Sequence, residues 1–187
     1  MNLKLILAAL SIPVLLILQS AEAIDKTELK KEAVSIVKRF GSTLKPELKN
    51  AIMTGGPEHA IYVCSERAPA IAQSLSDDTG WYVNRVSLKP RNSQTAIPDA
   101  WERKVLEQFD QRQASGESAE KMAFSEVVNG KFRFMKAQGV QTVCMNCHAA
   151  EIKPETEAAL REKYPLDKAR GYSLGQIRGA FSLSRDL

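Results

Sequence analysis

The chain has 187 residues, of which 44% are hydrophobic and 26% are charged. This composition can bury a sizeable core in one domain and excludes a disordered tail. The net charge is +4, and lysine and arginine alternate with acidic residues instead of forming blocks, so the sequence indicates no nucleic-acid partner.

The N-terminal stretch predicts an export signal over residues 1–23. Lys4 precedes an apolar run from Leu5 to Leu18, and Ala21-Glu22-Ala23 places small residues where signal peptidase cleaves. The run is shorter than the roughly 20 residues of a membrane span and Pro13 interrupts it, although an uncleaved anchor is the alternative. No cysteine follows the run, which argues against a lipoprotein. We therefore expect one mature domain, residues 24–187, soluble in the periplasm and free of the membrane after cleavage.

Two helices are expected first in the mature chain. Apolar residues at steps of three and four predict helices over Lys26–Ile52 and Glu58–Leu75, separated by a Gly-Gly-Pro turn at 55–57. Gly41 and Pro46 are expected to bend or break the first helix. Pro69 should kink the second, because proline cannot donate to the preceding turn.

Beyond residue 80 the pattern predicts a sheet. Trp81–Lys89 alternates like a strand, and Asn129-Gly130 between two apolar runs is a strong hairpin signal, because both turn residues need positive φ. The further expected elements are a helix over Asp99–Gln111, hairpin strands over Met122–Val128 and Lys131–Ala137, a helix over Glu155–Lys163 and a strand over Gln176–Leu183. Helices followed by a mostly antiparallel sheet make an α+β fold.

The motif Cys144-Met-Asn-Cys147-His148 directly follows the predicted hairpin and is the attachment pattern of c-type haem. Its spacing places two thiols about one helical turn apart, which suits the two vinyl groups on one edge of the porphyrin. The next imidazole can then ligate the iron. A redox dithiol would leave the histidine unused, and a zinc site needs four ligands, for which the chain offers only Cys64 and His59 in addition. We therefore expect one covalent haem c, with His148 as an iron ligand.

A second axial ligand from the protein must come from upstream, since no Met, His or Cys follows His148. Cys64 is a candidate because a free thiol is a liability in an oxidising compartment and metal ligation would protect it. It could instead be a small buried hydrophobe. His59 is the rival imidazole. The remaining alternatives are an open or water-bound site and a methionine, namely Met53, Met122 or Met135.

Three basic residues, Arg85, Lys89 and Arg91, lie on one face of the predicted strand or just beyond it. Guanidinium groups on this face either bind the haem propionates or are simply solvated. Three aromatic residues, Trp101, Phe132 and Phe134, either wall the pocket or belong to the core.

Several motifs occur in one order: Ala60-Ile-Tyr-Val-Cys64, Arg85-Val-Ser-Leu-Lys-Pro-Arg91, Pro98-Asp-Ala-Trp101, the Cys-x-x-Cys-His motif, Tyr164-Pro-Leu-Asp167 and Gly175-Gln-Ile-Arg178-Gly179. In this the chain resembles the PAS-like single-haem c-type cytochrome family, catalogued as a domain of unknown function. Members occur as stand-alone exported proteins and as sensory modules. The resemblance covers nearly all of the mature chain and implies a PAS-like central antiparallel sheet flanked by helices. It also implies iron ligation by His148 and Cys64. The loop Ser93-Gln-Thr-Ala96 departs from the Asn-Pro that is usual in the family.

Two function classes stay open. The first is a haem-based redox or gas sensor, which would need a signalling partner because the sequence shows no output domain. The second is a small electron-transfer cytochrome with a protein redox partner. A peroxidase-like enzyme would need an open iron site and a distal acid–base residue, for which His59 is the only histidine, so we do not expect an enzyme.

Overall fold

The computed structural model describes residues 25–187, so the predicted signal peptide over residues 1–23 lies outside the described residues. Its centre is one antiparallel sheet with the strand order β1-β4-β3-β2. The strands are β1 (Tyr82–Val86), β2 (Ala123–Val128), β3 (Lys131–Gly139) and β4 (Ile177–Asp186). The α-helices are α1 (Lys26–Thr79), α2 (Ala100–Ala114), α3 (Met145–His148) and α4 (Pro154–Lys163), and the 3₁₀ turns are η1 (Ala119–Lys121) and η2 (Thr142–Cys144). The predicted α+β class is confirmed.

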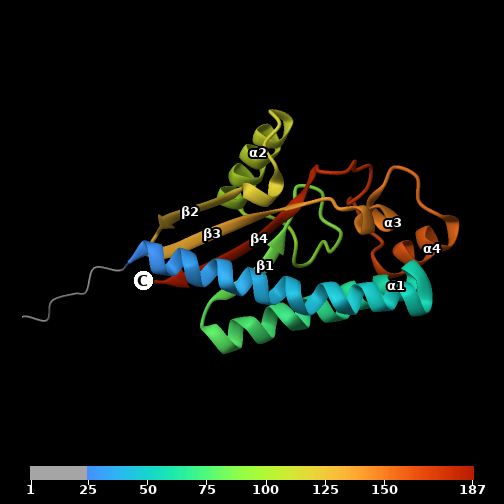
Figure 1. The fold of residues 1–187 in the computed structure, drawn as a ribbon, viewed down its shortest axis with the longest axis horizontal. Helices are drawn as coiled ribbons and strands as arrows, with labels where there is room; N and C mark the ends of the chain where they lie inside the picture. Colours follow the sequence, from blue (N-terminus) through green and yellow to red (C-terminus); the bar gives the residue numbers. More distant parts are fainter. Residues whose placement is uncertain (1–24) are drawn as a thin grey trace, which may run out of the picture.

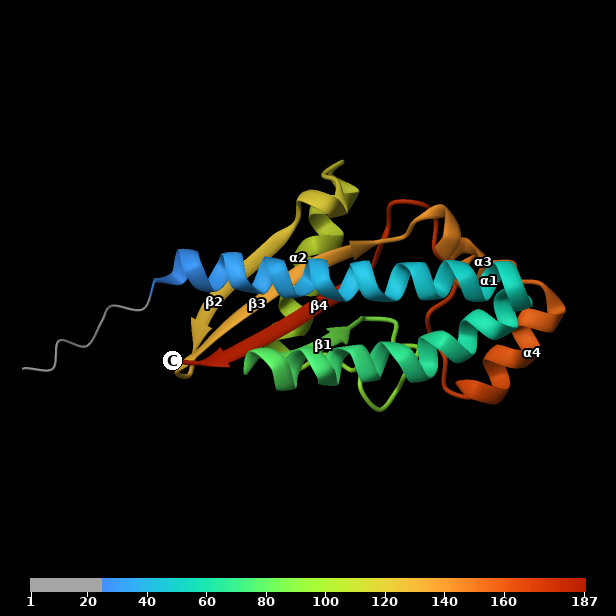
Figure 2. The same ribbon diagram turned by 60° about the horizontal axis from the view of Figure 1, so that its bottom comes forward.

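Helix α1 covers one face of the sheet as two antiparallel arms, residues 26–54 and 57–79, while α2 lies on the other face (Figure 1). The backbone leaves helical geometry only at Gly55 and at Gly56, which has φ 71° and ψ −172°. That combination is open almost solely to glycine, so Gly56 is where the chain can reverse. The turn of α1 lies beside α3 and α4, beyond the end of the sheet (Figure 2). No helix within residues 25–187, including this long one, is apolar enough over a sufficient length to cross a membrane.

The expected break at Gly41 and Pro46 is wrong, because the first arm runs through both residues with helical geometry. An interior proline costs about 3 kcal/mol. Phe40 and Leu44, just before Pro46, are both buried against the rest of the core, and this packing holds the helix together. The second arm, which contains Pro69, bends partway along its length (Figure 2), as the sequence predicts.

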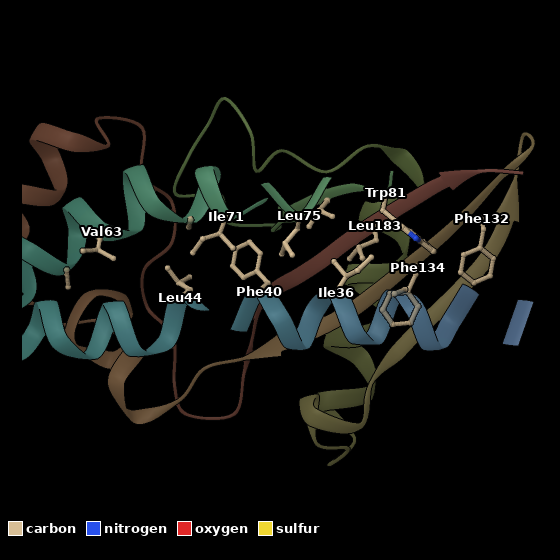
Figure 3. Close-up of a cluster of buried hydrophobic side chains, with 14 of the residues drawn as sticks. Ile36, Phe40, Leu44, Val63, Ile71, Leu75, Trp81, Phe132, Phe134 and Leu183 are labelled. Atoms are coloured by element: carbon tan, nitrogen blue, oxygen red, sulfur yellow. The ribbon is translucent and has the colours of Figure 1, made fainter. Parts of the chain in front are cut away.

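The main apolar core lies between the two arms of α1 and the sheet (Figure 3). Phe40 packs edge-on against Phe181 with 5.1 Å between ring centroids, and Trp81 packs against Phe132 with 6.0 Å. Phe132 and Phe134 are therefore core residues. A second core joins the opposite face of the sheet to α2 and η1, and contains Val86, Val105, Leu106, Phe109, Met122, Met135 and Ala180 among others.

The four predicted strands are present, and β1 is shorter than predicted. Asn129 and Gly130 adopt φ of 51° and 75°, and they join β2 to β3 in the predicted hairpin. In contrast, β1 ends at Val86, because the next backbone N–H, that of Ser87, donates to the carbonyl of Ala96 at 3.0 Å. Lys89 and Arg91 therefore lie on a loop, and the alternation predicted for them does not continue.

Candidate functional site

A cavity of about 1830 Å³, which extends along the sheet as far as the hairpin at Asn129, includes the chemically distinctive side chains in its lining. Its lining includes Cys64 from the second arm of α1, together with Cys144, Cys147 and His148 from the segment that follows β3. All three cysteines of the sequence therefore meet one space, and each is half-buried with a free thiol. Arg85, Arg91, Tyr164 and Arg178 also line it.

The Cys-x-x-Cys-His motif folds as the sequence requires for haem attachment. The 3₁₀ turn η2 ends at Cys144 and passes directly into α3, which contains Cys147 and His148. Helical backbone over these residues places the two thiols about one turn apart. The backbone N–H of Gln141 donates to the sulfur of Cys144 at 3.4 Å, which closes the turn.

His148 is held as a neutral imidazole. Its Nδ1 lies 2.7 Å from the carbonyl oxygen of Ala169, and a carbonyl can only accept, so we assign the proton to Nδ1. Burial and the nearby guanidiniums of Arg178 and Arg91 lower its pKa to about 2. The lone pair is then on Nε2, which accepts a hydrogen bond from Nε of Arg178 at 3.4 Å, so a metal can bind this nitrogen only once that guanidinium turns away. A neutral imidazole fixed through its other nitrogen is the form that binds a metal.

A buried ion pair braces this histidine. Arg91 Nη2 lies 3.2 Å from the carboxylate of Asp167, whose side chain is 2% exposed. The same nitrogen donates to the carbonyl oxygens of Cys147 and Ala169. Asp167 also accepts from the N–H of Ala169 at 2.8 Å and from Arg170 at 3.1 Å. The loop around Ala169 and the attachment motif are therefore tied together through one guanidinium.

Cys64 lines the same cavity from the second arm of α1. Burial raises the pKa of its thiol, while the guanidiniums of Arg85 and Arg91 act to lower it. The guanidinium of Arg85 lies over the ring of Phe40 at 5.2 Å. Burial and the neighbouring Cys64 raise the pKa of Tyr164 to about 12, so this phenol is a neutral hydroxyl beside the thiol.

The other candidates for a second ligand lie elsewhere. His59 is exposed, sits against Gly55 at the turn of α1 and does not line the cavity. Met53 is 73% exposed, whereas Met122 and Met135 are fully buried in the core beneath α2. Of the named side chains considered upstream, Cys64 alone lines the cavity with His148.

The three basic residues singled out in the sequence are separated in space. Arg85 lines the cavity, and Arg91 is engaged by Asp167. Lys89 is exposed, with Nζ 5.0 Å from the ring centre of Tyr172. Trp101 lies on α2, where Arg133 stacks on it at 4.3 Å, and neither it nor the two phenylalanines of β3 line the cavity.

Sequence reasoning did not single out Arg178 as a site residue. In β4, Gly179 pairs with Gln138 but Ile177 pairs with Gly139, so Arg178 is the extra residue of a β-bulge. A Cβ on Gly179, which has φ 157°, would lie 2.4 Å from the carbonyl oxygen of Val86. A glycine inside a predicted strand is a bulge signal. Gly179 was therefore a signal in the sequence that the side chain of Arg178 leaves the regular alternation of the strand.

The comparisons with known proteins agree with this architecture. The crystal structure of the cyanobacterial haem protein Tll0287 matches with a TM-score of 0.66 and 24% identity, covering 87% of this chain and 96% of that one. The match supports the PAS-like α+β fold. No curated protein sequence matches significantly. The sequence profile of the Tll0287-like family matches residues 16–185. The family resemblance seen in the motifs is thereby confirmed, and the chain belongs to the Tll0287-like family.

Proposed function

We propose that this chain is an exported protein with one covalent haem c, attached to Cys144 and Cys147 and ligated by His148 and Cys64, that acts as a redox or gas sensor. One observation carries the proposal: a Cys-x-x-Cys-His turn, a neutral His148 Nε2 and the thiol of Cys64 meet in the same cavity. The solved relative is itself described as a haem protein.

The residues present fit this cofactor. Leu44, Ile61, Ala68 and Val143 give the lining apolar surface for a porphyrin, and the thiols supply two attachment points on one helical turn. When bound, haem supplies a one-electron change at iron. Thiolate donates more charge than the thioether of Met/His cytochromes c and favours the ferric state, so we expect a low midpoint potential.

A sensing role is favoured by the surroundings of Cys64. Burial already acts to raise the pKa of this thiol, so it remains a thiolate only while positive charge is close to it. Loss of one positive charge on reduction raises the pKa further and favours a protonated thiol, which is a weaker ligand. The midpoint potential should therefore fall as the pH rises. A carrier would instead keep both ligands, because exchanging one slows electron transfer.

The deciding experiment is a redox titration at several pH values, with carbon monoxide added to the reduced protein. The sensor proposal expects a pH-dependent midpoint and binding of carbon monoxide to the ferrous form. Cys64→Ser should shift the Soret band and raise the potential, whereas His59→Ala should do neither. A midpoint independent of pH together with no carbon monoxide binding would leave the alternative, a small electron-transfer cytochrome.

Export and partners belong to the same proposal. The sequence signal at 21–23 predicts a periplasmic protein beginning at Ile24, with one haem added to its mass. Intact-mass measurement of protein from the periplasm tests this, and a retained residue 1 would contradict it. We propose no catalytic reaction, and we expect a protein redox or signalling partner.

A further inference from the structure

Strand β2 forms one edge of the sheet (Figure 1), and the outer side of its backbone has no partner within residues 25–187. The N–H of Ala137 donates to the carbonyl oxygen of Met122 at 3.1 Å, just before β2 begins. In an antiparallel pair every second residue bonds to the neighbouring strand. The residues of β2 that bond to β3 are therefore the even-numbered ones, Phe124, Glu126 and Val128. The outward N–H and C=O groups belong to the residues between them, Ala123, Ser125 and Val127.

This edge lacks the features with which proteins usually protect an exposed strand. Strand β2 contains no proline or lysine, and its register with β3 is continuous over all six residues. Its one charged side chain, Glu126, accepts from Trp101 Nε1 at 2.8 Å on the face that α2 covers, and Val127 is 37% exposed. An edge of this kind accepts a further strand, whose backbone bonds supply affinity while alternate side chains supply specificity. The side chains that flank β2 therefore decide which segment can bind.

One flank of the first arm of α1 borders this edge on the other face of the sheet. On that arm Arg39 pairs with Asp78 of the second arm at 3.0 Å. Glu47 pairs with Arg67, also of the second arm, at 2.7 Å. Steps of three and four place a different set on the opposite flank, namely Lys30, Val34, Lys38, Gly41 and Lys45. Lys38 and Lys45 line the cavity together with Val128 of β2, so this flank lies toward β2.

The lysine row, defined as Lys30, Lys38 and Lys45, carries positive charge without a partner. All three residues are exposed, and none forms an ion pair in the part of the chain that the structure describes. The acids of the same arm are already engaged, Glu28 by Lys31, Glu32 by Arg185 and Glu47 by Arg67. A Cβ added to Gly41, between Lys38 and Lys45, would meet no atom within 4 Å, so the space beside the row is open. The row therefore complements an acidic ligand that lies along β2.

We propose that an extended acidic segment of a partner protein binds as a fifth strand beside β2, with its carboxylates against the lysine row. A second copy of this chain fits less well, because two β2 strands paired about a two-fold axis would bring both lysine rows onto one face, where they repel each other. A membrane surface can attract the lysines but cannot bond to the backbone of β2. The inference names the kind of partner that a sensor or a carrier needs, and it does not depend on how iron is ligated.

The probe is a synthetic peptide in which glutamate alternates with threonine, long enough to span the six residues of β2. Amide hydrogen exchange of the ¹⁵N-labelled holoprotein is measured by NMR with and without the peptide. With free peptide at about ten times its Kd, exchange of the outward N–H groups of Ala123, Ser125 and Val127 should slow about tenfold. The N–H groups that already bond to β3 should change little. A peptide with lysine in place of glutamate should have no effect.

Two sets of variants separate the charge from the backbone. Lys38→Glu with Lys45→Glu should weaken peptide binding at least about tenfold. The matched control, Lys104→Glu with Lys153→Glu, changes the net charge equally at exposed positions elsewhere and should alter the Kd less than about threefold. Ser125→Pro removes one outward N–H and leaves the bonds to β3, so it should abolish the slowed exchange, whereas Ser125→Ala should bind like wild type.

Several results would overturn the proposal. The peptide has no effect, or its binding is unchanged by Lys38→Glu with Lys45→Glu; this variant decides the question if Ser125→Pro does not fold. Outward N–H groups that exchange slowly without peptide and faster on dilution would show a second copy at the edge. Binding to phosphatidylglycerol vesicles with no effect of the peptide would assign the lysine row to a membrane surface. None of these results bears on haem attachment, which acid–acetone extraction tests separately.

Discussion

The two ends of the sheet are stabilised by different interactions. At one end Phe40, Trp81 and Phe134 pack between α1 and the strands in an apolar cluster. At the other end the segment 140–176 folds around the buried pair of Arg91 and Asp167. Apolar burial contributes about 25 cal/mol per Å² whatever the orientation, whereas a buried ion pair must first offset the loss of hydration. The first end can therefore fold on its own contacts, while the second gains from a ligand that completes its charges.

The largest effect expected from this comparison follows removal of both attachment thiols. Cys144→Ala with Cys147→Ala should abolish covalent haem, so that acid–acetone extraction leaves no haem on the chain. Hydrogen exchange should then quicken over residues 140–176, because the cavity loses its cofactor contacts, and remain slow in the core beneath α1. An equal loss of hydrogen-exchange protection at both ends of the sheet would contradict the proposed difference between them. The wild-type holoprotein, which should retain haem on extraction, is the reference.

Phe134→Ala probes the apolar end. The side chain is 0% exposed, and its removal should leave a cavity in the core between the sheet and α1. We expect a loss of about 4 kcal/mol in the free energy of unfolding, measured by urea denaturation at constant haem content. Val127→Ala, on the exposed part of the neighbouring strand, should cost under about 1 kcal/mol. A loss below about 2 kcal/mol for Phe134→Ala would show that the core relaxes around the gap.

Asp167→Asn probes the polar end. The change keeps the shape but leaves the Arg91 guanidinium buried without a counter-charge, and we expect a loss of about 3 kcal/mol. The matched control is Asp186→Asn, whose exposed partner Lys131 lies 2.8 Å away, with an expected cost of under about 1 kcal/mol. Because Asp167 also fixes the loop that carries Ala169, the histidine ligand should loosen and the Soret band broaden. An unchanged spectrum would show that the Arg91–Asp167 pair does not hold His148 in place.

The smallest predicted effect concerns the cap of α2. Asp99 accepts the N–H of Glu102 at 2.8 Å and lies 2.7 Å from Arg133. Burial acts to raise its pKa, but the bond from Glu102 and the contact with Arg133 prevail and lower the pKa below its usual value. Its contribution is therefore present above that usual value and is lost as the pH falls through the folded-state pKa. Asp99→Ala should cost about 1 kcal/mol at pH 7, and the difference from wild type should shrink toward pH 3.

Local patterns predicted most of the fold. The turn at Asn129-Gly130 and the helix ending at Lys163 depend on residues adjacent in sequence, and both were predicted. The continuity of the first arm through Pro46 was not, because it rests on the packing of Phe40 and Leu44 against distant strands. In the site, the attachment motif is local, while the position of Arg178 in the cavity lining depends on pairing between β3 and β4. The ion pair of Arg91 with Asp167 could not be predicted, because the two residues are 76 positions apart and no local pattern connects them.

The position of the chain ends has a practical consequence. The last residue, Leu187, donates its N–H to the carbonyl oxygen of Gly130 at 3.0 Å, and Arg185 pairs with Glu32 near the start of α1. Both ends of the described chain therefore lie at the end of the sheet away from α3 (Figure 1). A protein immobilised through a tag joined after Leu187 would keep its tether away from α3, which contains Cys147 and His148. Electrode and surface-binding measurements can thus be made in one defined orientation.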